Sequence, residues 1–314
     1  MQLPVVEGVR LVGERSDLVA REARLWLIET ADGARGVLRR NEPDSIDATS
    51  ARALEDLGWL HSYLARLGAT AFRAPVPLQL WDGRSFCVEG GAVWEALSYV
   101  PGHRVGWDPN PPLRALGRLL AHYHDAAQSL GVIGQRPVAF PLAGLAELIW
   151  RPGLPPAPTW LADLCAELHD RLPDTTTASS SPVVVIHGDF TAHTVLAAGQ
   201  PPVPVGAIDF NLAHVERPVA DVAFGLWRMG RPYQSATWLD LGRVAAFVGG
   251  YGEARQLTPT DIGLIPLCLW GRGVQMAAKA FLRGRAVPST CPAQIGWLHD
   301  SEQRLCELIV SASA

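Results

Sequence analysis

Two aspartates each follow a short apolar segment, at the point where a strand gives way to a loop. Asp189 comes after VVVIHG, and Asp209 comes after PVGAI. A buried β-hairpin formed by these two segments would bring both carboxylates close together. Two close carboxylates repel each other unless a cation or a shared proton lies between them. The pair therefore suggests a divalent metal, with one acid left to act as a general base.

The elements that must position these acids change in type along the chain. Segments 24–30 and 36–41 flank the turn-forming ADGAR and predict a β-hairpin, and 86–102 predicts two more strands around a Gly-Gly turn. Leucines at spacings of three and four over 50–67 predict an amphipathic helix. The first hundred residues are therefore expected to form a small β-rich region with one helix.

Beyond residue 102 the pattern is mainly helical. Pro-rich and Ser/Thr-rich loops bracket one short helix, and buried strands are expected at 183–190 and 204–210. Longer helices are expected over 113–131, 219–230, 237–251, 260–283 and 292–311. The expected class is α+β, with a small β-rich N-terminal lobe and a larger, mainly helical C-terminal lobe.

Composition excludes several classes of protein. The chain has 314 residues, 48% of them hydrophobic and 18% charged, with a net charge of −4, which excludes disorder over most of its length and argues against nucleic-acid binding. The longest apolar runs are too short to cross a membrane, and the N-terminus lacks the pattern of a signal peptide, so a cytoplasmic protein is expected. Five scattered cysteines predict buried thiols rather than disulfides or a zinc site.

Three short motifs resemble those of a known family. They are His187-Gly188-Asp189, then Asp209 within Ile-Asp-Phe, then Asp221 within Pro-x-x-Asp-x-Ala. In this order and spacing they resemble the aminoglycoside phosphotransferase and choline kinase superfamily. Its members are small-molecule kinases with a two-lobed, protein-kinase-like fold.

The resemblance implies that the two lobes have different functions. Residues 1–100 would form the N-terminal nucleotide-binding lobe, and residues 101–314 the C-terminal catalytic and acceptor-binding lobe. The implied cofactors are ATP and Mg²⁺. Phosphoryl transfer fits such a site because its catalysis rests mostly on positioning and on neutralising phosphate charge.

The resemblance also implies a role for each matching residue. Asp189 would accept or orient the proton of the attacking hydroxyl, and Asp209 would hold magnesium against the ATP phosphates. His187 would brace the loop that carries Asp189. Asp221 would form hydrogen bonds to that loop from the following helix.

The first departure from the family pattern lies at the second metal ligand. The family usually has asparagine five residues after the catalytic aspartate, and here that position is Thr194. A hydroxyl can bind magnesium, but it is a weaker ligand than an amide carbonyl. Asn211, two residues after Asp209, offers an amide oxygen as an alternative. A weakened metal site is one expected consequence.

The second departure is the phosphate-binding lysine of the third strand. The only lysine of the chain is Lys279, far from that strand. Arg39 or Arg40 takes the matching place, and strand alternation points only one of them toward the nucleotide; Arg39 is favoured. Its expected helix partner is an acid such as Glu55, for which an exposed helix carboxylate is an equally good interpretation.

The remaining nucleotide contacts are expected to come mostly from the backbone. GERSD (13–17) has one glycine, and backbone amides around Ser16 would cover the phosphates. Residues 94–97, including Glu95 and Leu97, are interpreted as the hinge between the lobes, whose backbone groups would contact adenine.

The C-terminal lobe suggests what the acceptor is not. Residues 210–314 contain ten basic and eight acidic side chains, whereas a polycationic acceptor calls for a cleft rich in carboxylates. Basic residues also gather along one expected helix and its exit, at Arg272, Lys279, Arg283 and Arg285. They form either a solvated basic face or an anchor for an acidic group. The acceptor is therefore expected to be a neutral or carboxylate-bearing alcohol, or a peptide hydroxyl.

Three functions follow as hypotheses. The first is an ATP- and Mg²⁺-dependent O-phosphotransferase acting on a small metabolite or natural product, in antibiotic resistance or biosynthesis. The second is a kinase acting on peptide Ser or Thr in modified-peptide biosynthesis with a partner lyase. The third is a pseudokinase scaffold, which Thr194 and the missing lysine favour and which the two retained acids oppose. No membrane or nucleic-acid partner is expected.

Overall fold

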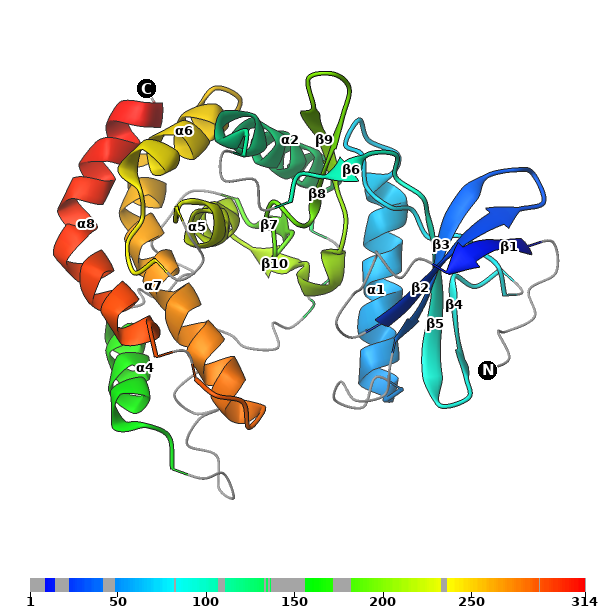
Figure 1. The fold of residues 1–314 in the computed structure, drawn as a ribbon, viewed down its shortest axis with the longest axis horizontal. Helices are drawn as coiled ribbons and strands as arrows, with labels where there is room; N and C mark the ends of the chain where they lie inside the picture. The colour runs from blue at the N-terminus through cyan, green and yellow to red at the C-terminus, as the bar shows by residue number, and fades with distance from the viewer. Residues whose placement is uncertain are drawn as a thin grey trace. The chain divides into compact units, whose positions relative to one another are not determined.

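The computed structural model describes most of the chain, and the description below concerns those residues. They are 9–14, 23–41, 49–81, 83–106, 111–132, 134, 136, 156–171, 182–232, 236–287 and 289–313. The chain divides into two compact units, one of residues 1–101 with 206–208, and one of residues 102–205 with 209–314. The first holds an antiparallel sheet and the second is mostly helical, so the predicted α+β class is confirmed (Figure 1).

The N-terminal unit is built around one five-stranded antiparallel sheet. Its strand order is β1-β2-β3-β5-β4, and each neighbouring pair is antiparallel. The strands are β1 (Val9–Glu14), β2 (Ala23–Thr30), β3 (Arg35–Asn41), β4 (Phe86–Glu89) and β5 (Ala92–Ser98). The two hairpins expected from the turn signals therefore form, and β3 pairs with β5 to join them into one sheet.

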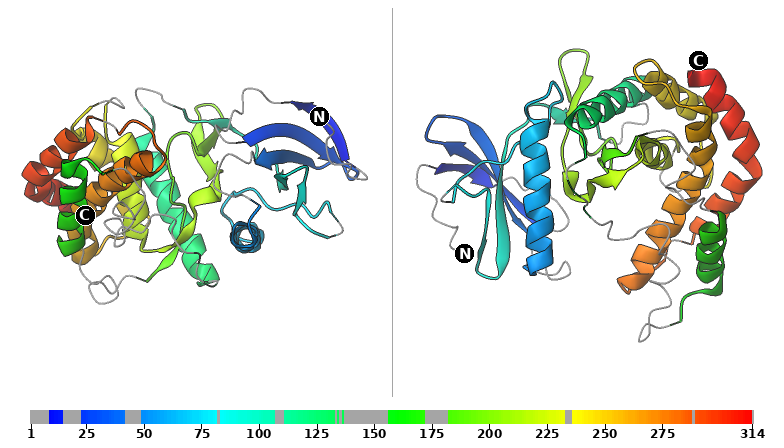
Figure 2. Two further views of the ribbon diagram at one scale, coloured as in Figure 1. Left: turned by 90° about the horizontal axis from the view of Figure 1, so that it is seen from below. Right: turned by 180° about the vertical axis from the view of Figure 1, so that it is seen from behind.

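Strand alternation gives this sheet two different faces. One face buries an apolar cluster of Trp26, Ile28, Leu38, Trp94 and Ala96. The intervening residues of β3 and β5 point to the other face, where the side chains of His61 and Glu95 meet. Helix α1 (Ala51–Leu67) lies beside the sheet (Figure 2). Ser50 begins the helix by accepting a hydrogen bond from the backbone of Ala53 at 3.2 Å.

The C-terminal unit combines long helices with short strands. Its helices are α2 (Leu113–Leu130), α4 (Thr159–Arg171), α5 (Pro218–Met229), α6 (Leu241–Gly252), α7 (Pro259–Leu282) and α8 (Cys291–Ser313). Its strands are β6 (His103–Arg104), β7 (Val184–Ile186), β8 (Val195–Ala198), β9 (Val203–Ala207, shared with the other unit) and β10 (His214–Glu216), with a 3-10 turn, η3, at Phe210–Leu212. Helix α6 starts at residue 241 rather than 237 because Asp240 accepts a hydrogen bond from Arg243 and caps it.

The strand pairing predicted for 183–190 and 204–210 is wrong. Strand β7 pairs with β10, in the register Ile186 to His214, and β9 pairs with β8. The short strands β8 and β10 were absent from the sequence prediction because three- and four-residue strands leave almost no periodic signal. The two aspartates are therefore brought together by another route, described below.

Helices α2 and α6 pack with their backbones in contact. A Cβ atom on Gly117 would lie 1.9 Å from the carbonyl oxygen of Phe247, and one on Gly250 would lie 1.8 Å from that of Arg114. Only glycine fits at both positions, so the two helices approach unusually closely. This approach brings His124 of α2 to Tyr251 of α6.

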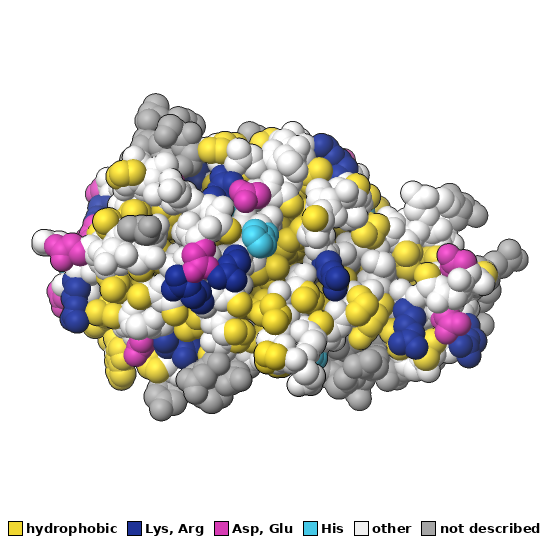
Figure 3. All heavy atoms as spheres, turned by 90° about the horizontal axis from the view of Figure 1, so that it is seen from above, with side chains coloured by type: hydrophobic (Ala, Val, Ile, Leu, Met, Phe, Trp, Pro, Cys, Tyr) yellow, Lys and Arg dark blue, Asp and Glu magenta, His cyan; other side chains and the backbone are white. Residues whose placement is uncertain are grey.

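The side chains on one face of the molecule, the cysteines and the polarity of the helices bear on the expectations from composition. On the face shown in Figure 3, basic, acidic and hydrophobic side chains are interspersed. The five cysteines are free thiols, and the helices of the described part are all too short or too polar to cross a membrane.

Candidate active site

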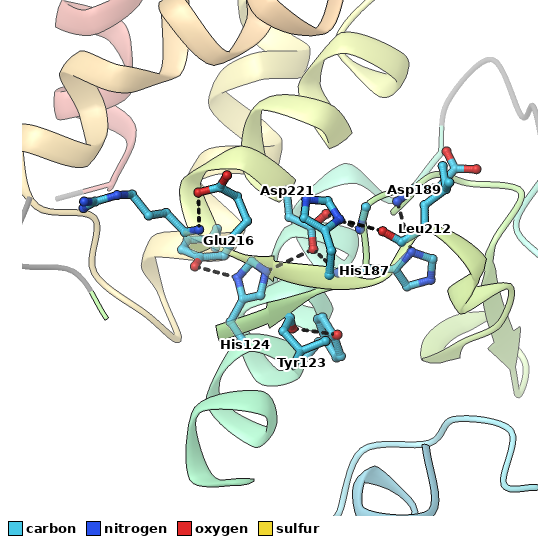
Figure 4. A network of polar contacts seen from close by, with 12 residues as sticks. Tyr123, His124, His187, Asp189, Leu212, Glu216 and Asp221 are labelled. Atoms are coloured by element: carbon cyan, nitrogen blue, oxygen red, sulfur yellow. Dashed lines mark hydrogen bonds and ion pairs between the residues drawn. The ribbon is translucent and has the colours of Figure 1, made fainter. Parts of the chain in front are cut away.

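A buried carboxylate in α5 organises the loop that carries Asp189. Asp221 is fully buried, and its two oxygens accept hydrogen bonds from the backbone N–H groups of His187 at 2.6 Å and Gly188 at 2.8 Å. One of these oxygens also lies 3.3 Å from Nε2 of His124 (Figure 4). Burial alone would raise the pKa of Asp221, but these partners outweigh it and hold the pKa below its usual value. Asp221 therefore stays charged and keeps the loop in place.

His124 is the link between this carboxylate and helix α6. Its Nδ1 lies 2.9 Å from the hydroxyl of Tyr251 and its ring is fully buried. Since a carboxylate only accepts, Nε2 carries the proton and Nδ1 accepts from the tyrosine. Burial lowers the pKa of His124, which favours this neutral form.

His187 and Thr194 hold the backbone of Asp189 from both sides. Nδ1 of His187 accepts the N–H of Asp189 at 3.2 Å, and the hydroxyl of Thr194 donates to the carbonyl of Asp189 at 2.8 Å. The ring of His187 packs against Phe210, with ring centroids 4.4 Å apart. The loop of residues 187–194, here called the Asp189 loop, is thus fixed through its backbone.

The side chain of Asp189 is left available by this arrangement. Its carboxylate accepts no hydrogen bond from any residue of the described chain and is partly buried. Burial raises its pKa, the positive charges of Arg272 and Arg228 oppose the rise, and the negative charge of Asp209 adds to it. A carboxylate with a raised pKa and an uncommitted oxygen is suited to accept a proton.

Gly188 brings the Asp189 loop against the segment that follows Asp209. It has φ of 74°, and a Cβ atom there would lie 2.2 Å from the carbonyl oxygen of Leu212. A side chain would therefore push the two segments apart. This contact and the pairing of β10 with β7, rather than a direct hairpin, join the segments that carry the two aspartates, and the charge of Asp209 acts on Asp189.

Asp209 is exposed and has an unusual backbone. Its φ and ψ are 67° and 56°, a left-handed conformation that no other described non-glycine residue has. One carboxylate oxygen accepts a hydrogen bond from the amide of Asn211 at 2.7 Å. Aspartate tolerates this conformation better than most residues, and such local strain is found where function requires it.

The hydroxyl of Thr194 forms hydrogen bonds inside the Asp189 loop, which is not what is expected of a metal ligand. The residue is buried, and its hydroxyl accepts the N–H of Thr191 at 3.0 Å while donating within the Asp189 loop. This hydroxyl is committed to closing the loop. The interpretation of Thr194 as a magnesium ligand is therefore corrected.

The N-terminal unit contains a second buried carboxylate network. Glu95 on β5 lies 3.5 Å from Nε of Arg39 and 3.0 Å from Nε2 of His61, and accepts from Asn41 at 3.0 Å. Burial alone would raise the pKa of Glu95, but Arg39, His61 and Asn41 lower it to about 2. The choice of Arg39 over Arg40 fits this network, because the guanidinium of Arg40 lies on the opposite face, 5.7 Å from the ring of Trp94.

Three other expected nucleotide contacts have different outcomes. Glu55 is exposed on α1, and the acid that pairs with Arg39 is Glu95 instead. The hinge interpretation of residues 94–97 is wrong, because they form the middle of β5; the N–H of Ala96, for example, donates to Ser85 at 3.1 Å. Leu97 pairs with Val37 in the same sheet. Ser16 lies outside the described residues.

Sequence reasoning missed four members of these networks. His124 and Tyr251 support Asp221, and His61 and Asn41 support Glu95. The buried face of the predicted helix over 50–67 was the one usable signal, since it places His61 beside buried leucines. The other contacts join residues about fifty to more than a hundred positions apart, and no local pattern reveals such pairs.

Comparison with known proteins identifies relatives over most of the chain. The family described as "Phosphotransferase enzyme family" matches residues 19–257. A homoserine kinase of Bradyrhizobium diazoefficiens is 27% identical over 250 residues, which cover 75% of this chain and 71% of that protein. An uncharacterized protein of Deinococcus radiodurans is 29% identical over 246 residues, covering 73% and 69%.

Solved structures share the fold at low identity. An amicoumacin kinase bound to AMP-PNP, Ca²⁺ and its antibiotic has a TM-score of 0.62 and 15% identity, covering 94% of this chain and 90% of its own. A microcompartment-associated aminopropanol kinase has a TM-score of 0.58 and 17% identity, covering 97% and 93%. An aminoglycoside 2'-phosphotransferase bound to GDP has a TM-score of 0.58 and 16% identity, covering 96% of this chain and 94% of its own.

Proposed function

The chain belongs to the phosphotransferase enzyme family and is a kinase, and we propose that it transfers the terminal phosphate of ATP to a hydroxyl of a small molecule. The observation that carries this proposal is the contrast within the Asp189 loop. Its backbone is held by Asp221, His187 and Thr194, while the carboxylate of Asp189 accepts no hydrogen bond from the described residues. A fixed backbone with an available carboxylate is what positioning of a nucleophile requires.

In the proposed reaction Asp189 takes the proton of the acceptor hydroxyl. The acceptor oxygen bonds to the terminal phosphorus as the bond from that phosphorus to the ADP oxygen breaks. Burial and the nearby charge of Asp209 raise the pKa of Asp189, which makes it a better base than an exposed aspartate. Asp221 and His187 act as positioning residues, because they reach the reaction only through the backbone of the loop.

The residues near Asp189 fit a magnesium ion. Asp209 offers an exposed carboxylate, and the neighbouring amide of Asn211 adds a second oxygen. Among the described residues, no three His, Cys, Asp or Glu side chains are grouped as a metal cage. Mg²⁺ suits such a sparse site because it is usually held by one or two carboxylates together with substrate phosphates, whose charge it neutralises.

For the N-terminal unit, we propose that Arg39 binds a phosphate of the nucleotide. Its guanidinium is mostly buried and is held beside Glu95, whose lowered pKa keeps that carboxylate charged at neutral pH. Arginine keeps the positive charge of the usual lysine and can contact two phosphate oxygens at once. The pairing with Glu95 limits the directions in which this side chain can extend.

The acceptor class follows the names of the relatives. A homoserine kinase, an amicoumacin kinase and an aminopropanol kinase are each named for a small hydroxyl-bearing molecule. A small-molecule alcohol is therefore the proposed acceptor.

Calorimetric titration of ATP, with and without Mg²⁺, tests the nucleotide and metal parts. We expect Mg²⁺ to strengthen binding to the wild type, and this gain to be lost in Asp209→Asn, since asparagine keeps the backbone conformation and removes the charge. The exposed Asp163→Asn is the matched control and should behave as the wild type. Absence of ATP binding at every Mg²⁺ concentration would support a scaffold instead.

Release of ADP in the presence of an acceptor tests the chemical step. Asp189→Asn should lose about 10²- to 10⁴-fold in turnover, the usual contribution of a general base, while still binding ATP. A variant that loses both would indicate that the loop has collapsed. Full activity in this variant would remove Asp189 from the proposed reaction.

A further inference from the structure

Three arginines act electrostatically on residues of the Asp189 loop. Arg272 of α7 and Arg228 of α5 both act electrostatically on Asp189, and Arg228 acts together with Arg104 of β6 on His193. All of these residues belong to the C-terminal unit. Positive charge is therefore concentrated where the acceptor hydroxyl must approach Asp189.

These arginines lack the acidic partners that other arginines of the chain have. Within the described chain, Arg104, Arg228 and Arg272 form no ion pair with a carboxylate. Surface arginines elsewhere pair readily with acids, as in Arg10 with Glu29, Arg171 with Glu302 and Arg255 with Asp125. Within the described residues, the positive charge of Arg272 is thus balanced only at a distance, by the charges of Asp189 and Asp221.

Arg272 is held in a fixed position despite this. Its guanidinium carbon lies 3.6 Å from the centre of the Phe224 ring, and one of its amino groups donates to Gln275. Its Nε is buried and has no hydrogen-bond partner among the described residues. Burial lowers the pKa of Arg272 to about 9, the charge of Asp189 opposes this, and that of Arg228 adds to it.

A desolvated cation with an unused donor is costly to keep. The cost is offset when an anion binds, because a guanidinium can form two parallel charge-assisted hydrogen bonds to a carboxylate or phosphate. A cationic acceptor would be repelled by the same three side chains. Three cations with no carboxylate partner among the described residues thus favour an anionic group over a cationic one.

We propose that the acceptor is an alcohol that carries an acidic oxygen group, and that Arg272 and Arg228 bind this group while the hydroxyl faces Asp189. The proposal rests on the proposed kinase function and specifies its substrate class. Under this proposal Arg272 acts as an anchor for an acidic group, whereas Arg285 is exposed at the helix exit and belongs to a solvated face.

A matched series of acceptors tests it. 4-Hydroxybutyrate, 1,4-butanediol and 4-amino-1-butanol have the same chain length and differ in carrying an acid, a neutral group or an amine. ADP release should be fastest with the acid, with kcat/KM about 10- to 100-fold above the diol, the value of a charge-assisted pair. A preference for the diol or the amine would overturn the proposal while leaving the kinase function standing.

Variants then assign the preference to the arginines. Arg272→Gln and Arg228→Gln should each reduce the preference for the acid, Arg272→Lys should keep part of it, and the control Arg285→Gln should keep all of it. An equal loss of kcat/KM with all three acceptors would overturn the proposal, because it would indicate that these arginines bind the transferred phosphate instead of the acceptor. An acid preference that survives both Gln variants would also overturn it.

Binding without turnover provides a second readout. 4-Hydroxybutyrate titrated into the enzyme loaded with AMP-PNP and Mg²⁺ should release heat in the wild type and none in Arg272→Gln. Inorganic phosphate is titrated in the same way, and its affinity is compared with that of 4-hydroxybutyrate. Tighter binding of 4-hydroxybutyrate indicates a carboxylate-bearing acceptor, and tighter binding of phosphate indicates a phosphate-bearing one. No binding of either anion overturns the proposal, whereas failure of ATP itself to bind would instead reject the kinase function.

Discussion

The two compact units each contain a fully buried carboxylate with a lowered pKa and a histidine partner, yet the two networks differ in what they hold. Asp221 binds two backbone N–H groups of the Asp189 loop, whereas Glu95 binds the side chains of Arg39, His61 and Asn41. A backbone N–H can only donate. A histidine can exchange its tautomer, and the serine hydroxyl beside His61 can rotate to match it.

This difference predicts different tolerance to change. The network around Asp221 fixes the path of the backbone. Only a carboxylate fits this position, because both of its oxygens must accept hydrogen bonds. The network around Glu95 positions a cationic side chain and can rearrange. A buried charge therefore holds the backbone in one unit, and in the other it holds the side chain of Arg39, the proposed phosphate ligand.

The largest effect is expected from Asp221→Asn. The amide nitrogen of asparagine would face a backbone N–H, so two buried donors would point at each other without an acceptor. The free energy of unfolding should therefore fall by about 3–5 kcal/mol. Turnover should fall by at least about 100-fold because the Asp189 loop loses its anchor. Urea unfolding and steady-state kinetics measure both effects.

Asp240→Asn is the matched control for this substitution. Asp240 accepts one backbone N–H at the start of α6, a role that asparagine performs equally well, so its stability should change by only a few tenths of a kcal/mol. Equal losses in the two variants would contradict the special role of Asp221.

A smaller effect is expected from Glu95→Gln. Its partners can adjust, so we expect a loss of about 1–3 kcal/mol in stability. ATP binding should weaken because Arg39 loses its ion pair with Glu95, with little change in kcat. Glu89→Gln on the neighbouring strand is exposed and should match the wild type. Loss of kcat without loss of ATP affinity would contradict the assignment of Arg39 to nucleotide binding.

The same variant has a predicted pH signature. The pKa of Glu95 is lowered from 4.5 to about 2, so its stabilisation is complete above pH 4.5 and is lost as the pH falls toward 2. Glu95→Gln should flatten this acid limb of the unfolding free energy. An unchanged limb would show that another acid dominates it.

The smallest effect is expected at the far end of the Asp189 loop. Thr194→Val removes the hydroxyl that bonds Thr191 and Asp189 and should cost about 1–2 kcal/mol with a modest fall in turnover, whereas Thr194→Ser should be close to neutral. Equal stability of the two variants would show that the hydroxyl does nothing. Tighter Mg²⁺ binding by Thr194→Asn would return this position to the metal site.

Much of the fold was predictable because its elements are long and periodic. The helix over 50–67, the hairpin of 24–30 and 36–41, and the strong helix over 113–131 all form within a residue or two of the expected bounds. The division into a nucleotide-binding and a catalytic lobe stays a prediction. The hinge was misplaced because a four-residue segment such as 94–97 carries no pattern that distinguishes the inside of a strand from the residues beyond it.

The sequence alone determined the types of residue available and the local elements: acids after apolar strands, no lysine on the third strand, and helices wherever leucines recur every three or four positions. Only the tertiary structure decided which of them meet. His124 reaches Asp221 across 97 positions, and Glu95 replaces Glu55 as the partner of Arg39 across a strand pair. The reason is physical, since local periodicity reports which face of an element is buried, whereas the identity of the partner depends on how those faces pack.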